Sequence, residues 1–284
     1  LYAPSSFKHW PARPHWMLKK QSAPICAEVS KAAMPIATKT TLREMNMATE
    51  EEIIQALDSN IMCFNVESKD ELHTINKIAQ QINKKANISF RVNPAINVNT
   101  HPYITTGMRD NKFGIDQSDI LSLYKDASVL DGISIAGIDF HIGSQIMELE
   151  PYLESLAKII TIADDLDASG IPLKHIDIGG GLGIPYEGEP IVDKKVYISE
   201  IIKIIGDRKL SLVIEPGRSI VGEAGLLITK IINIKESSMK SFAITDAGMN
   251  DMLRPPLYEA FHSIIEVVNK SIGKISYDVV GPVC

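Results

Sequence analysis

The chain has 284 residues, of which 45% are hydrophobic and 23% are charged. This balance is typical of a globular protein that buries a core, and it argues against disorder throughout. The formal net charge of -6 gives no general attraction to nucleic acid or to an anionic membrane surface. Small molecules are therefore the expected partners.

The three cysteines, Cys26, Cys63 and Cys284, are widely spaced and form no CxxC pair. No histidine lies near them in zinc-finger spacing, so no metal site is expected. An odd number of scattered cysteines favours a reducing, cytoplasmic setting. No apolar run reaches the core of a signal peptide or the roughly 20 residues of a membrane span.

Short apolar runs rich in Ile, Val and Phe alternate with amphipathic segments from about Met47 onward. This rhythm is typical of β/α units around a parallel sheet, so the α/β class is predicted. Strands are expected at Ile61–Val66, Ile88–Asn93, Ile135–His141, His175–Ile178 and Leu212–Glu215. Each has polar residues or glycines at its C-terminal end, where the site of a TIM barrel is built.

Helical patterns separate these strands, and the clearest are Glu50–Leu57, Lys69–Lys84 and Pro151–Ala168. The alternation of strand and helix patterns ends after Arg218. Strands without an intervening helix are predicted at Leu226–Lys235, Phe242–Asp246 and Ile275–Val280. A mainly antiparallel β domain is therefore expected to begin near Gly222.

The first 45 residues show neither helical nor strand periodicity, and no stable element is expected before Leu42. Two interpretations stay open for this segment. It is either a flexible tail, or foreign or frame-shifted sequence that stands where early barrel units should be. The predicted domains are an unassigned segment at 1–45, a partial barrel at 46–222 and the start of a β domain at 223–284.

The strongest local signal is an apolar strand that runs from His175 directly into the glycine-rich segment Gly179–Gly183. Glycines let backbone N–H groups approach an anion closely, and such a nest suits a phosphate. A tight turn without a ligand is the alternative. The segment does not have the GxGxxG pattern of dinucleotide-binding proteins.

Two other strand ends carry groups suited to a flat, anionic cofactor. Glu215, Gly217 and Arg218 would supply a carboxylate, a backbone N–H and a guanidinium to the same end of the barrel. His141 could stack on an aromatic ring, and Ser144 offers a hydroxyl to a phosphate. The alternatives are a surface Glu–Arg pair and a structural histidine.

These blocks stand in an order that resembles the diaminopimelate decarboxylases. They are His141-Ile-Gly-Ser-Gln-Ile, Asp177-Ile-Gly-Gly-Gly-Leu-Gly-Ile, Glu215-Pro-Gly-Arg, Asp246-Ala-Gly-Met-Asn-Asp-Met-Leu-Arg-Pro-Pro-Leu-Tyr258 and Gly281-Pro-Val-Cys284. Phe64-Asn-Val-Glu-Ser68 and Lys112-Phe-Gly-Ile115 also match, so the resemblance covers roughly Met47 to Cys284. That family is a branch of the alanine-racemase-like, fold type III pyridoxal-phosphate enzymes. The resemblance implies a partial TIM (β/α) barrel followed by the start of a mainly antiparallel β domain.

The resemblance also implies roles for particular residues. It gives cofactor binding to His141, Ser144, Gly179, Gly180, Gly181, Glu215, Pro216, Gly217 and Arg218. His141 would stack on the pyridine ring of pyridoxal 5'-phosphate. Glu215 would keep the ring nitrogen protonated, which makes the ring a better electron sink.

The substrate implied by the resemblance is meso-diaminopimelate, which the family converts to L-lysine and CO2 in lysine biosynthesis. Arg218, Arg254 and Tyr258 would bind it, because an arginine fork matches a carboxylate. Cys284 would be a catalytic proton donor, usually contributed across a homodimer interface. Ornithine and arginine decarboxylases share the fold, but the block that contains Arg254 favours diaminopimelate. A racemase would not need that block.

The sequence departs from the family at the lysine that bonds covalently to the cofactor. The nearest candidate is Lys39, which lies too close to Phe64 and has no strand pattern before it. The chain also stops at Cys284, before a glutamate that helps to hold the substrate. We therefore expect a chain related to the decarboxylase but without useful turnover. The alternative is a non-catalytic remnant that binds the cofactor or a partner.

Overall fold

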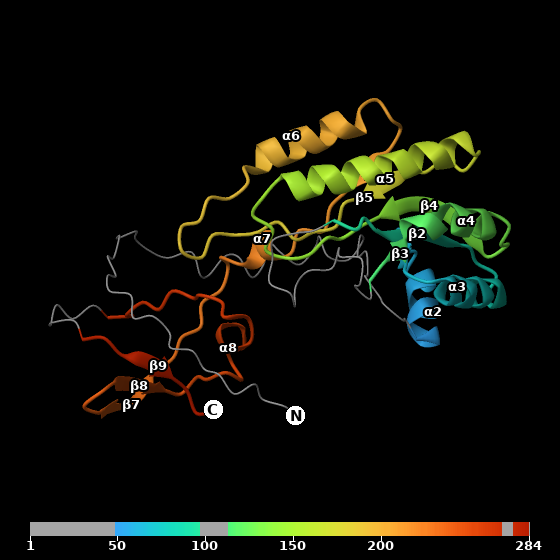
Figure 1. The fold of residues 1–284 in the computed structure, drawn as a ribbon. Coiled ribbons are helices and arrows are strands. Elements are labelled where there is room, and N and C mark those ends of the chain that lie inside the picture. Colours follow the sequence, from blue (N-terminus) through green and yellow to red (C-terminus); the bar gives the residue numbers. More distant parts are fainter. Residues whose placement is uncertain (1–48, 97–112, 269–274, 284) are drawn as a thin grey trace. The chain divides into compact units, whose positions relative to one another are not determined.

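The computed structural model describes residues 49–96, 113–268 and 275–283 (Figure 1). These residues form two compact units. The larger unit holds the described residues up to Leu227 together with Phe261–Ser263, and the smaller unit holds the others from Ile228 onward. The predicted domain boundary at 222/223 falls a few residues earlier and stays a prediction. The segment 1–45, with Cys26 and Lys39, and Cys284 lie outside the described residues.

The larger unit contains one parallel sheet, in the order β1-β2-β4-β5-β6 with β3 beside β2. Its strands are β1 (Phe64–Val66), β2 (Ala86–Asn93), β3 (Ile115–Asp116), β4 (Ile133–Asp139), β5 (His175–Asp177) and β6 (Ser211–Val213). Each predicted strand of this region overlaps an observed one. Parallel neighbours need crossover connections, and helices provide most of them.

The helices of the larger unit alternate with these strands along the chain, as Figure 1 shows. They are α2 (Glu50–Asp58), α3 (Lys69–Gln81), α4 (Gln117–Ser128), α5 (Glu150–Ala168), α6 (Lys194–Ile205) and α7 (Arg218–Val221). The expected partial TIM barrel is therefore confirmed. Helices α4 and α6 add to the three helical patterns named from the sequence.

Short polar side chains fix where several helices begin. Thr49 and Glu52 form a capping box at the start of α2. Ser68, Asp116 and Asp193 each accept a backbone N–H in the first turn of α3, α4 and α6. Each such cap satisfies a donor that the helix itself leaves unpaired. The direction in which each helix leaves its strand end is thus set locally.

The two faces of the sheet differ in chemistry because side chains alternate along a strand. Phe90 of β2 meets Tyr124 of α4 edge to face, with ring centroids 4.9 Å apart, so this face packs on the helices. Its neighbour Ser89 donates a hydrogen bond of 2.6 Å to Asp139 of β4 on the other face. The helix-covered face forms the apolar core, and the opposite face is buried and polar.

A histidine and a glycine fit together on the polar face. The imidazole of His175 covers Gly137 so closely that any side chain at Gly137 would overlap it. The ring extends to Cys63, whose sulfur lies 3.6 Å from Nε2. Burial lowers the pKa of His175, with Lys174 as a second cause, and therefore favours the neutral ring.

The smaller unit contains a three-stranded sheet, in the order β7-β8-β9. Strands β7 (Ile231–Glu236) and β8 (Ser241–Thr245) pair antiparallel, whereas β9 (Asp278–Val280) pairs parallel with β8. The sheet is therefore mixed. The short helix α8 (Arg254–Tyr258) lies between β8 and β9 along the chain, where no helix was predicted.

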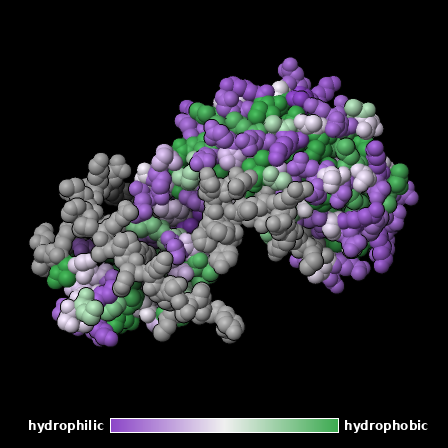
Figure 2. Space-filling view, viewed as in Figure 1, coloured by the Kyte–Doolittle hydropathy of each residue, from purple (hydrophilic) through white to green (hydrophobic). Residues whose placement is uncertain are grey.

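Apolar side chains remain exposed on both units. Figure 2 shows them between hydrophilic residues on the visible face of the larger unit. In the smaller unit every residue of β7 is exposed, including Ile231, Ile232 and Ile234. Within the described ranges, no helix is both long and apolar enough to cross a membrane.

Gly137→Ala is expected to lower the free energy of unfolding by about 1–3 kcal/mol, because the added methyl group overlaps the His175 ring. The His175→Ala background removes that ring and should remove most of the penalty. Denaturant titrations of the wild type, both single variants and the double variant measure the coupling. Additive losses would show that the imidazole is not the obstacle.

Candidate active site

Three loops meet at one edge of the sheet because neighbouring strands are in register. Asp139 of β4 pairs with Asp177 of β5, which pairs with Val213 of β6. The residues two positions further on, His141, Gly179 and Glu215, therefore lie at the same edge. The Glu215 N–H donates to the Gly179 carbonyl at 2.9 Å, which ties two of these loops together. This is the carboxyl edge, where TIM barrels build their sites.

The glycine loop, defined here as Gly179–Gly181, is held by two side chains. The Gly179 N–H donates to Oδ1 of Asp177 at 2.8 Å, and the Gly180 N–H donates to Nδ1 of His141 at 3.1 Å. An Nδ1 that accepts a hydrogen bond leaves the proton of a neutral imidazole on Nε2. The ring of His141 is thus fixed in both position and tautomer.

Only one N–H of the glycine loop stays available to a ligand. Gly179 and Gly180 donate within the protein, whereas the Gly181 N–H donates no hydrogen bond among the described residues. The sequence predicted that the backbone of all three glycines would hold a phosphate. The geometry favours Gly181 as the donor and gives the other two glycines a part in fixing the loop.

Close main-chain contacts leave no room for a side chain at Gly180 or Gly181. A Cβ atom at Gly180 would overlap the carbonyl oxygen of Glu215, and one at Gly181 would overlap that of Gly143. Neither neighbour is a flexible side chain that could move aside. Gly181 also has a φ of +93°, which favours glycine. The loop is therefore packed backbone against backbone, which is the arrangement that lets N–H groups reach an anion.

The interior next to this loop is acidic. Burial raises the pKa of the Cys63 thiol, and the carboxylates of Asp139, Asp177 and Glu215 raise it further. The thiol therefore stays protonated and is not a nucleophile. Glu215 is half-buried, with its Oε1 atom enclosed, so a carboxylate stands at the carboxyl edge as the sequence predicted.

Gln145, in the loop after β4, links that loop to the loops after β5 and β6, and no role was predicted for it. Nη1 of Arg218 donates to Oε1 of Gln145 at 2.9 Å. Nε2 of Gln145 donates to the carbonyl of Ile184 at 2.6 Å, and the Ile184 N–H returns a bond of 3.3 Å to Oε1. Gln145 directly follows Ser144 in the quoted block, which was the available signal. Its side chain fixes the guanidinium of Arg218 to the loop after β5.

A buried ion pair at the ends of β1 and β2 was also not predicted. Nη1 of Arg91 lies 2.8 Å from Oε1 of Glu67, and their side chains are 5% and 13% exposed. Oε2 of Glu67 accepts the N–H of Gly114 at 3.0 Å. From the sequence, only the presence of polar residues at the ends of these strands was predicted. The pair extends the polar rim of the carboxyl edge to the first two strands.

The other predicted residues are placed as follows. Ser144 is half-buried in the loop after His141, Pro216 is exposed, and Gly217 is the N-cap of α7. Arg254 begins α8 and Tyr258 ends it, both in the smaller unit. The structure therefore brings together the predicted cofactor residues of the larger unit. Cys284 lies outside the described residues.

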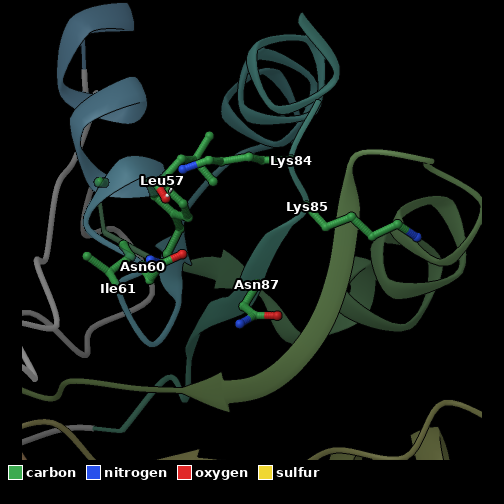
Figure 3. Close-up of a pocket in the computed structure, with 8 residues that line it drawn as sticks. Leu57, Asn60, Ile61, Lys84, Lys85 and Asn87 are labelled. Atoms are coloured by element: carbon green, nitrogen blue, oxygen red, sulfur yellow. Dashed lines mark hydrogen bonds between the residues drawn. The ribbon is translucent and has the colours of Figure 1, made fainter. Parts of the chain in front are cut away.

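A cavity of about 290 Å³ lies at the opposite edge of the sheet (Figure 3). Phe64 and Asn87, near the amino ends of β1 and β2, line it together with Lys84. Nζ of Lys84 is held by the Leu57 carbonyl at 3.0 Å and by Asp58 at 2.8 Å. Features at this end of a barrel usually serve stability, so we keep the site at the carboxyl edge.

The fold and the site define a β/α-barrel protein with a glycine loop and an acidic residue at adjacent strand ends. The chain matches the family model described as "Pyridoxal-dependent decarboxylase, pyridoxal binding domain" over residues 28–222. The chain belongs to this family. The resemblance stated from the sequence is therefore confirmed, and so is pyridoxal phosphate as the cofactor of the family.

Individual relatives carry a common name. The diaminopimelate decarboxylase of Neisseria meningitidis serogroup A is 45% identical over 236 residues, which are 83% of this chain and 58% of that protein. The Haemophilus influenzae enzyme of the same name is 46% identical over 239 residues, with 83% and 57% covered. The structure of the Helicobacter pylori enzyme complexed with L-lysine has 45% identity and a TM-score of 0.79, with 83% and 59% covered. The chain thus spans under three fifths of the length of these relatives.

Gln145→Gly is expected to lower the free energy of unfolding by roughly 1–3 kcal/mol. Gln145 has a φ of +60°, so glycine relieves about 1–2 kcal/mol of backbone strain. The variant also loses four hydrogen bonds, of which one joins a charged group and one is a weak bond to the sulfur of Met147. Together they contribute more than the relieved strain. Chemical denaturation measures the balance.

The matched control is Asn60→Gly, an exposed amide residue with a φ of +51°. It has less strain to relieve, because asparagine tolerates a positive φ better than glutamine. It makes no side-chain hydrogen bond among the described residues, so the change to glycine should be neutral or stabilising. Stabilisation by both variants would mean that the Gln145 bonds contribute little.

Proposed function

We propose that this chain is the cofactor-binding part of a pyridoxal-phosphate-dependent diaminopimelate decarboxylase. The observation that supports this most directly is the glycine loop, packed against Glu215 and bonded to His141. The reaction would be the decarboxylation of meso-diaminopimelate to L-lysine and CO2. Its substrate is inferred from the common name of the relatives and from the block that contains Arg254.

The glycine loop and its neighbours fit a phosphorylated aromatic ligand. The Gly181 N–H, the hydroxyl of Ser144 and the segment Gly217–Arg218 would bind the phosphate. Nη1 of Arg218 donates to Gln145, and the planar fork of a guanidinium matches a phosphate. The bond to Gln145 limits the orientations that the guanidinium of Arg218 can take, so less side-chain entropy is lost when the phosphate binds.

His141 and Glu215 would act on the ring. The imidazole of His141 is held by Gly180, so it can stack on the ring without first being ordered. The Glu215 carboxylate would hold a proton on the ring nitrogen through a charge-assisted hydrogen bond. Pyridoxal phosphate, when bound, supplies the electron sink for the pair that CO2 leaves behind.

The remaining assignments concern substrate and assembly. Arg218, Arg254 and Tyr258 would bind diaminopimelate, and Cys284 would donate a proton, usually across a homodimer interface. Meso-diaminopimelate and a second copy of the chain are thus the proposed partners, in a cytoplasmic setting. The alternative function is cofactor binding without turnover. The position of Lys39 favours that alternative for this chain.

Arg218→Ala should weaken pyridoxal phosphate binding by about tenfold or more, because it removes a charged donor from the phosphate. Equilibrium dialysis of the full chain measures the Kd. The matched control is Arg208→Ala. Arg208 forms a bidentate ion pair with Asp164, with N···O distances of 2.7 and 2.8 Å, and it lies outside the proposed site. Equal affinities for wild type and Arg218→Ala would count against the phosphate site.

The second prediction separates a decarboxylase from a binding protein. After incubation with pyridoxal phosphate and borohydride, no stoichiometric adduct is expected on Lys39, because no strand pattern places that lysine in the barrel. Mass spectrometry of the digested protein tests this, and a CO2-release assay with meso-diaminopimelate runs beside it. An adduct on Lys39 together with turnover would overturn the non-catalytic alternative and support activity of this chain.

A further inference from the structure

A buried tyrosine outside the predicted site holds the glycine loop from behind. Tyr152, in the first turn of α5, is 1% exposed, and its hydroxyl donates to the Gly180 carbonyl at 3.0 Å. Its ring packs edge to face on Tyr197 of α6, with centroids 5.0 Å apart. Two helices therefore keep this hydroxyl in place under the loop.

The hydroxyl controls the direction of a single peptide group. A trans peptide is planar, so the Gly180 carbonyl and the Gly181 N–H point in opposite directions. When Tyr152 holds the carbonyl toward the helices, the Gly181 N–H must face away from them. The other side of Gly180 is fixed as well, because its N–H donates to His141. Gly180 is thus clamped at both of its polar groups.

This matters because glycine peptides rotate easily. Gly181 has a φ of +93°, and neither residue has a side chain to resist a flip of the peptide between them. A flipped peptide would aim a carbonyl oxygen, and no longer an N–H, at the anion. The hydrogen bond from Tyr152 adds to the main-chain packing of the loop and stabilises the peptide orientation in which the N–H, and not the carbonyl oxygen, faces the anion.

We propose that Tyr152 is a positioning residue that orients the Gly181 N–H toward the phosphate of the cofactor. The proposal rests on the proposed function, since it assumes that the phosphate binds at this loop. Burial raises the pKa of Tyr152 above its ordinary value, so the hydroxyl stays a donor across the physiological range.

The same unit contains a matched control. Tyr124 of α4 is fully buried, packs edge to face on Phe90, and donates from its hydroxyl to the carbonyl of Gly137 at 2.6 Å. Gly137 lies within β4, away from the glycine loop. Tyr124→Phe and Tyr152→Phe each remove a hydrogen bond to a glycine carbonyl, and Tyr124→Phe also removes the acceptor of the Phe90 N–H at 3.5 Å. Only Tyr152 supports the loop.

The test compares pyridoxal phosphate with pyridoxal, which lacks the phosphate, by equilibrium dialysis of the full chain. Tyr152→Phe should reduce the ratio of the two affinities by about tenfold. Tyr124→Phe should leave the ratio unchanged, although both variants lower the melting temperature. An unchanged ratio in Tyr152→Phe, or an equal fall in both variants, would overturn the proposal. A wild type that binds both ligands equally would instead overturn the phosphate site itself.

A second measurement does not depend on any variant folding. In wild-type protein labelled with 15N-glycine, inorganic phosphate should shift the Gly181 amide resonance more than those of Gly179 and Gly180. The latter two amides are already bonded to Asp177 and His141. A larger shift at Gly180 than at Gly181 would contradict the orientation assigned to Tyr152.

Discussion

The close approach of two glycines to neighbouring main chains is the constraint on which the rest of the site depends. Gly180 rests on the carbonyl of Glu215, and Gly181 rests on that of Gly143. These contacts draw the loops after β4, β5 and β6 into one layer. Any side chain at either position would separate the loops, and the carboxylate and imidazole that flank them would lose their common orientation.

The polar interior of the larger unit is the second condition on which the site depends. Carboxylates at Asp139 and Asp177 share the buried face with Cys63 and raise the pKa of its thiol. Burial likewise raises the pKa of Asp139 itself, with Ser89 opposing the shift. Apolar side chains of similar size would stabilise a sheet at least as well. The arrangement makes sense when a charged ligand lies at the end of the same strands.

The sequence predicted the strand ends well because their signals are local. A strand, a glycine segment and a carboxylate are each visible within a few residues, and the parallel register then aligns them. Gln145 and Tyr152 could not be predicted this way. Each acts on main-chain groups more than 25 residues further along the chain, and in a sequence a tyrosine on a helix resembles any core residue. The mixed pairing of β9 is equally non-local, and Lys39 and Cys284 lie outside the described residues.

The glycine segment could also be a tight turn that binds nothing, and its hydrogen bonds favour the proposal that it binds a ligand. In a turn that binds no ligand, the backbone N–H groups are expected to pair within the protein or with water. Here Gly179 and Gly180 are satisfied, while Gly181 is turned outward by a tyrosine buried behind it. Gly181 is only partly buried, so an N–H that faces away from the protein can donate to water or to a bound anion. The parts that would bind the cofactor all lie in the larger unit, so cofactor affinity can persist independently of the residues proposed for turnover.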